Sequence, residues 1–268
     1  MRAGFSGMKR ILVPVDFSSR SANALAYAVA LGSASHAAID VLHVWHSDLA
    51  TPVTVARERA KHALREFVSG LALLGDAELQ RRTDHGDPYL TIVRTAQLGG
   101  YDLVVVAGPE PSRTDTDSVA CRLFCSASNP VLFVPARCRA LLRSEQERVL
   151  RLERILVPLA LAGAQLAALD YACELGRADG ARVEALLGPD LSPAQLQRFL
   201  ARPKAERVTA FELGEVSELS APRRAESVPF DLLVVSGKRV HVGERSADPR
   251  LERVALSVPC ACLSLPEA

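Results

Sequence analysis

The stretch KRILVPVDFSSRSANALAYAVALG, from Lys9 to Gly32, contains the pattern that decides the fold. The uninterrupted apolar run Ile11–Val15 predicts a strand that is buried on both faces of a sheet. Three serines, Ser18, Ser19 and Ser21, are candidate N-caps for a helix that begins directly afterwards. A buried strand followed at once by a helix is typical of α/β proteins with parallel sheets.

The same stretch returns in the second half of the chain. The segment ERILVPLA begins at Glu153 as KRILVPVD begins at Lys9, a shift of 144 residues. At this shift ALAYAVALG matches ALDYACELG. Further along, YDLVVVAG matches FDLLVVSG, and PVLFVP matches ACLSLP. Four blocks in the same order indicate a duplicated domain, the second copy being shorter in its middle.

Each copy is predicted to be a doubly wound parallel sheet of five strands, because strands alternate with helices. In the first copy a helix is expected after Ser18, and another opens with Asp87 as cap and Pro88 in its first turn. The polar strand 78–84 is expected at an edge of the sheet. The strands expected in the first copy are 11–15, 39–44, 78–84, 103–107 and 131–134, and two further helices are expected at 54–73 and 117–127.

The length of 268 residues suits two domains. We predict a first domain at 1–137 and a second, shorter domain at 152–268. The charged, helix-favouring stretch 138–151 is predicted to be a helical linker.

Bulk properties narrow the classes of partner. The net charge of +1 provides no overall attraction to nucleic acid or membrane. No apolar run has the length of a membrane span, and residues 1–7 contain no hydrophobic signal core. We therefore expect a cytoplasmic protein that binds neither nucleic acid nor membrane.

Cysteines and histidines do not form a metal-binding pattern. The pairs Cys121/Cys125 and Cys260/Cys262 lack the spacing of a zinc knuckle, so buried thiols are the favoured interpretation, with redox or metal roles as the alternative. His43 lies three residues from His46 in the sequence, with few candidate ligands nearby. No metal site is predicted.

The blocks ILVPVDFSSRSANALAYAVAL, VLHV, HGDP, YDLVVVAG and NPVLFVP together resemble the universal stress protein family, and the duplication resembles its tandem members. This resemblance covers nearly the whole chain. It implies two domains with the fold of adenine nucleotide alpha hydrolases, related by a pseudo-twofold axis. It also implies that the domains pair through their last strands, with 131–134 antiparallel to 262–265.

The family's nucleotide-binding members carry the motif Gly-x2-Gly-x9-Gly-Ser/Thr after the fourth strand, where backbone N–H groups hold phosphates. Here Gly108 keeps the first glycine, but Pro111 and Asp117 stand at the next two glycine positions. The loop is also shorter and carries three acidic residues against one arginine. Each of these departures disfavours a polyphosphate.

The resemblance still carries a candidate nucleotide site to the first copy, and for Asp16 and Ser118 helix capping is the open alternative. In the second copy Ala160 replaces the acidic residue, while Lys238 and Arg239 begin a basic loop that could bind a small anion. The candidate nucleotide-binding residues are Pro14, Val15, Asp16, Val44, Gly108, Ser118 and Val119.

Two functions remain open. The first is a non-catalytic stress-response protein that acts through an unknown protein partner, with its two domains paired within the chain and further association of two chains possible. It would need no cofactor. The second is a sensor that binds ATP in the first domain, with or without slow hydrolysis. An enzyme with a site elsewhere on the same fold is a third option, but no catalytic residue is assigned because no Walker A, G-x-S-x-G or H-E-x-x-H motif occurs.

Overall fold

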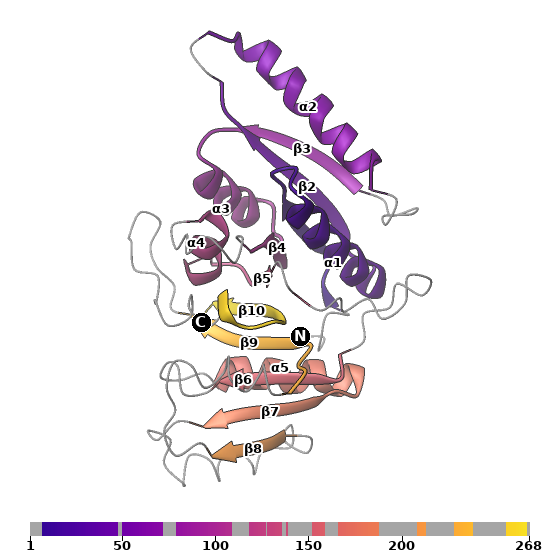
Figure 1. The fold of residues 1–268 in the computed structure, drawn as a ribbon, viewed down its shortest axis with the longest axis vertical. Coiled ribbons are helices and arrows are strands. Elements are labelled where there is room, and N and C mark those ends of the chain that lie inside the picture. The colour runs from indigo at the N-terminus through magenta and orange to yellow at the C-terminus, as the bar shows by residue number, and fades with distance from the viewer. Residues whose placement is uncertain are drawn as a thin grey trace.

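The computed structural model of the chain describes most of the first half and the sheet of the second. The described residues are 7–47, 50–71, 79–108, 118–126, 128–135, 138, 152–158, 166–187, 208–212, 228–237 and 256–266. Strands and helices alternate along them (Figure 1). None of the helices among these residues is long and apolar enough to cross a membrane.

The first half contains β1 (Arg10–Pro14), α1 (Ser19–Ser35), β2 (Ala38–Trp45), α2 (Val53–Ser69), β3 (Leu79–His85), α3 (Pro88–Leu98), β4 (Leu103–Ala107), α4 (Val119–Ser126) and β5 (Val131–Val134). The second half contains β6 (Arg154–Pro158), α5 (Leu166–Asp179), β7 (Arg182–Leu187), β8 (Val208–Glu212), β9 (Leu232–Gly237) and β10 (Ala261–Pro266).

The ten strands among the described residues belong to one sheet, in the order β3-β2-β1-β4-β5-β10-β9-β6-β7-β8. Neighbouring strands are parallel except at the centre, where β5 and β10 run antiparallel with Leu132 opposite Leu263. Read outwards from this centre, the two halves have the same strand order. The α/β class is confirmed, and the antiparallel arrangement expected for the last strands is what the sheet shows.

Most predicted elements lie within one residue of their predicted bounds, and β3 lies at an edge of the sheet as expected. Two helix bounds were wrong. The helix expected to reach residue 73 ends at Ser69, with Gly70 as its C-cap. The helix expected from residue 117 begins at Val119. Apart from Cys138, the predicted linker helix lies outside the described residues, and the domain boundaries stay predictions.

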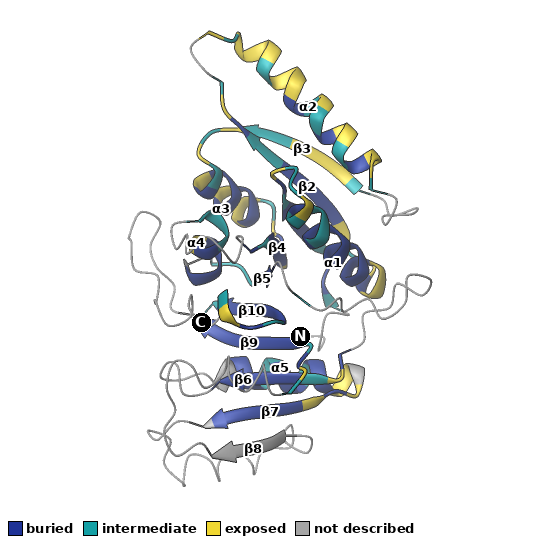
Figure 2. Ribbon diagram, viewed as in Figure 1, coloured by how far each residue is buried: buried dark blue, intermediate teal, exposed yellow. Residues whose placement is uncertain are grey.

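Helices cover both faces of the sheet. Buried residues of α1 and α5 belong to one apolar cluster on one face, and buried residues of α3 and α4 belong to a second cluster on the other. Figure 2 shows the central strands as buried and most of α2 and β3 as exposed. The continuous apolar runs of β1, β4 and β5 follow from this arrangement, because both of their faces are covered.

One helix–strand contact is repeated in both halves. A Cβ atom added to Gly32 of α1 would lie 2.7 Å from the Ile39 side chain of β2. A Cβ atom added to Gly176 of α5 would lie 2.9 Å from the Val183 side chain of β7. The matching glycines therefore allow the same close approach of helix to strand in each half.

Candidate functional site

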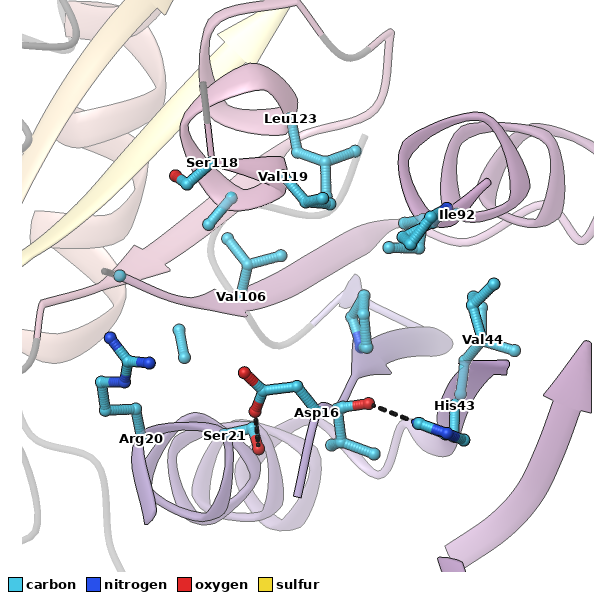
Figure 3. A pocket seen from close by; sticks show the side chains of 17 residues that line it. Asp16, Arg20, Ser21, His43, Val44, Ile92, Val106, Ser118, Val119 and Leu123 are labelled. Carbon is cyan, nitrogen blue, oxygen red and sulfur yellow. Dashed lines mark hydrogen bonds between the residues drawn. The ribbon is translucent and has the colours of Figure 1, made fainter. Parts of the chain in front are cut away.

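A cavity of about 330 Å³ lies at the carboxyl ends of β1 and β4 (Figure 3). In open parallel sheets this edge is where ligands bind. The cavity brings together all seven residues that the sequence singled out, from four separate segments of the chain: Pro14, Val15, Asp16, Val44, Gly108, Ser118 and Val119.

The Asp16 carboxylate is built into the turn between β1 and α1. Its Oδ1 accepts hydrogen bonds from the Ser18 amide at 3.0 Å, the Ser18 hydroxyl at 2.5 Å and the Ser21 hydroxyl at 2.8 Å. Ser18 is the N-cap of α1, because its own Oγ accepts from the Ser21 amide. The expected capping role is thus divided: Ser18 caps the helix and Asp16 holds Ser18 in place.

These contacts set the charge of Asp16. Partial burial alone would raise the pKa of this carboxyl, but the hydrogen bonds from Ser18 and Ser21, together with the Arg20 cation, outweigh it and lower the pKa below its ordinary value of 3.8. The group is therefore an anion at neutral pH. Among the described residues nothing donates to its Oδ2, which leaves this oxygen for a ligand.

The turn between β1 and α1 also contains Phe17, whose ring packs against two other aromatic rings. Phe17 has a left-handed backbone with φ of 63°, a conformation that costs energy in a residue with a side chain. Its ring lies 4.1 Å from that of His43 and 5.5 Å from that of Phe67. His43 Nδ1 lies 3.0 Å from the Val15 carbonyl oxygen and must donate its proton, because a carbonyl only accepts. Packing and hydrogen bonding thus compensate for the strained residue.

Gly108 has a packing role that the sequence did not reveal. A Cβ atom at this position would lie 2.9 Å from the Phe133 ring. The Gly108 amide donates to the Val134 carbonyl at 2.8 Å. Its N–H group is therefore used by the sheet and is not free to hold a phosphate.

Ser118 caps α4 and lines the cavity. The Cys121 amide donates to Ser118 Oγ at 3.2 Å, and the Arg122 amide donates to the Ser118 carbonyl at 3.0 Å. The capping alternative for this serine is confirmed. Pro111 and Asp117, at the lost glycine positions, lie outside the described residues.

Apolar side chains form the cavity walls, and several of these were not predicted from the sequence. Leu42 and Val44 come from β2, Ile92 from α3, Val106 from β4 and Leu123 from α4. Figure 3 shows Ile92, Val106, Val119 and Leu123 facing the space above Asp16. Such walls suit a flat, weakly polar group.

The structure provides no further support for the anion site, a metal site or a redox role of the cysteines in the residues that it describes. Lys238, Arg239 and Ala160 lie outside the described residues. Within the described part of the chain, no group of three or more His, Cys, Asp or Glu side chains could hold a metal ion. None of the six cysteines, all of which the structure describes, forms a disulfide, and all but Cys138 are buried.

Fold and cavity together define an α/β protein of the Rossmann-like class, with a ligand cavity at the carboxyl edge of a mostly parallel sheet. The sequence model described as the universal stress protein family matches residues 7–135. The segment 7–135 therefore belongs to the universal stress protein family.

Two solved structures share the fold over nearly the whole chain. A universal stress protein from Archaeoglobus fulgidus DSM 4304 has a TM-score of 0.75 at 17% identity, covering 99% of this chain and 98% of that one. A functionally unknown protein from Pseudomonas aeruginosa PAO1 has a TM-score of 0.63 at 15% identity, covering 98% and 94%. No curated protein matches the chain.

Proposed function

We propose that this is a non-catalytic stress-response protein whose first half binds a nucleoside-type ligand and reports its presence through contacts with a protein partner. The observation that carries the proposal is the single cavity lined by all seven candidate residues. Residues from β1, β2, β4 and α4 reach it although they are far apart in the sequence.

The cavity combines the two features that a nucleoside requires. Its walls are apolar, with Val44 on β2 and Val106 on β4, the strands on either side of β1. Its floor carries Asp16, an anion whose Oδ2 receives no hydrogen bond from the described residues and can accept from hydroxyl or amino groups of a ligand. An apolar pocket with a few fixed polar groups is the usual form of a small-molecule site.

The state of Asp16 supports binding without catalysis. A carboxylate whose pKa is lowered below 3.8 is a weak base at neutral pH. Its Oδ1 is held by two serines, and His43 directs its Nδ1–H to a backbone carbonyl. Both groups therefore stabilise the turn that forms the cavity floor.

Binding of ATP with slow hydrolysis is the alternative function. It is supported by the start of α4, where Ser118 and Val119 line the cavity and the helix dipole favours an anion. It is disfavoured by the Gly108 amide, which already donates to Val134.

Contact with a partner is supported by the position of α3. Its residues Pro88 and Ile92 line the cavity, whereas Leu90 and Leu98 are 48% and 83% exposed. A ligand that contacts one face of this helix can therefore affect what its other face presents to solvent. The cytoplasmic location, the lack of nucleic acid and membrane partners, and the association of two chains stay predictions.

The test is isothermal titration of nucleotide-stripped protein with adenosine and with ATP plus magnesium. We expect one site per chain and at least tenfold weaker binding by Asp16→Asn, because the substitution removes the anion at the cavity floor. Asp84→Asn is the matched control, since Asp84 pairs with Arg94 outside the cavity. No binding of either compound at millimolar concentration would contradict the proposal. Hydrolysis of bound ATP above the uncatalysed rate would favour the alternative.

A further inference from the structure

Arg20 is a polar cavity residue that neither the sequence motif nor the family match assigns. It lies in the first turn of α1, two residues after the N-cap Ser18. Its side chain lines the main cavity and also a neighbouring cavity of about 210 Å³. Figure 3 shows it extending on the same side of α1 as the Asp16 carboxylate.

The charge of Arg20 is available to a ligand. Among the described residues it forms no ion pair. It is near enough to Asp16 to contribute to the lowered pKa of that carboxyl, but the two groups form no salt bridge. A guanidinium with unused donors next to a cavity is a preferred partner of phosphate.

The neighbouring cavity contains further hydrogen-bond donors. Its polar side chains are Ser19, Arg20 and Asn23, all from the first turns of α1, and Val134 and Pro135 complete the lining. A hydroxyl, a guanidinium and an amide can each donate to an anion, and no carboxylate among the described residues lines this space. The positive end of the α1 dipole acts in the same direction.

Two backbone positions that usually hold phosphate after the fourth strand cannot donate to it in this chain. The Gly108 amide is bonded to Val134, and Pro111 has no N–H group. The loop that follows Gly108 carries three acidic residues and one arginine before Ser118, which repels a long polyphosphate. An anionic group on the ligand therefore gains more from the donors of α1 than from the Gly108 amide.

We propose that Arg20 binds the phosphate of a nucleoside monophosphate, with the nucleoside in the main cavity and the phosphate directed toward Ser19 and Asn23. This inference rests on the proposed nucleoside-binding function and names its ligand class. One guanidinium neutralises about one phosphate group. The additional phosphates of a triphosphate should therefore not increase its affinity.

The experiment compares adenosine, AMP and ATP as probes on the full chain by isothermal titration. The wild type is expected to bind AMP at least tenfold more tightly than adenosine, and ATP no more tightly than AMP. Arg20→Gln is expected to bring the AMP and adenosine affinities within about twofold of each other. Arg57→Gln, which removes an exposed cation from α2, is the matched control and is expected to keep the wild-type ratio.

Each contrary outcome identifies what has failed. Binding of adenosine and AMP with the same ratio in Arg20→Gln as in the wild type overturns the assignment of Arg20 and leaves the proposed function standing. ATP binding more than tenfold tighter than AMP overturns the monophosphate class. No binding of any of the three probes by the wild type overturns both the inference and the proposed function.

Discussion

The two halves of the sheet place a buried acid at the same position, but surround it differently. In the first half Asp40 lies opposite Leu12 of β1, and its Oδ2 accepts from Arg10 at 3.1 Å, from Arg82 at 3.5 Å and from the Tyr101 hydroxyl. In the second half Glu184 lies opposite Leu156 of β6. Its Oε2 accepts from Arg154 at 3.2 Å.

The aromatic neighbour changes together with the acid. Arg10 lies 4.4 Å above the Tyr101 ring, and Arg154 lies 5.2 Å above the Phe230 ring. The aspartate is accompanied by Tyr101, which has a hydroxyl, and the longer glutamate is accompanied by Phe230, which has none. The two halves thus keep the same strand-to-strand link by different combinations of side chains.

The clusters lie toward the amino ends of β1 and β6, where Arg10 and Arg154 begin the strands. At the carboxyl ends of the strands the two halves are not alike. At the carboxyl edge the first half has Asp16, and the matching position of the second half is Ala160. The ion pairs at the amino ends stabilise the sheet in both halves. In open parallel sheets ligands bind at the carboxyl ends of the strands. Both halves therefore have the stabilising cluster, whereas only the first half has an acid at this position of the carboxyl edge.

The largest effect on stability is expected from removing the arginine that pairs with Asp40 or the arginine that pairs with Glu184. Arg10→Met and Arg154→Met should each lower the free energy of unfolding by about 3 kcal/mol, because a buried carboxylate loses a cation that forms a salt bridge with it. Urea denaturation measures the change, and the exposed Arg57→Met serves as the control with a change below about 0.5 kcal/mol. A change that small in Arg154→Met as well would show that only the first cluster stabilises the fold.

A smaller effect is expected at Gly108. Gly108→Ala should lower the free energy of unfolding by about 2 kcal/mol, because the new methyl group meets the Phe133 ring. A second substitution, Phe133→Leu, should recover part of this loss by making room. If Gly108→Ala leaves stability unchanged and only weakens nucleotide binding, the packing role assigned to this glycine is wrong.

Tyr101→Phe makes the first cluster resemble the second and should cost about 1 kcal/mol, because Asp40 loses a donor. Adding Asp40→Glu should recover part of that cost if the longer acid replaces the hydroxyl, as the second half suggests. A double-mutant cycle by urea denaturation measures the coupling. Strictly additive costs would show that the two halves differ by chance at these positions.

The smallest effect is a change in the pH dependence of stability. Burial, then the hydrogen bond and charge of Asp40, raise the pKa of Tyr101 above its ordinary value of 10.0. The neutral phenol is thus favoured in the folded state, so its contribution is complete below pH 10 and is lost as the pH rises through the folded-state pKa. Thermal melts between pH 9 and about pH 11 should therefore fall less steeply for Tyr101→Phe than for the wild type. Parallel curves would contradict the raised pKa.

Much of the fold could be predicted because its signals are local. The apolar run of β4 and the Asp87–Pro88 helix start depend on neighbouring residues, and the structure matches both. The early end of α2 at Ser69 was missed, because the apolar pattern continues beyond the point where the helix stops. Repeated blocks also indicated two equivalent halves, which the strand order shows.

The site was only partly predictable. Asp16 and Val44 follow from the family resemblance, but Arg20 and Ile92 have no motif and join the cavity only through the fold. The Asp40 cluster was missed entirely, because its partners come from separate strands and loops. An acidic residue within the apolar strand AIDVLHVW was the one available signal.

Methyl NMR of the full chain titrated with AMP tests most directly whether only the first half contains the ligand site. We predict saturable shifts at the cavity residues Val44, Ile92 and Val106. The buried methyl groups of Val157 and Val235 in the second half should not move. Shifts at Val157 and Val235, or none at Val106 at millimolar AMP, would contradict the account.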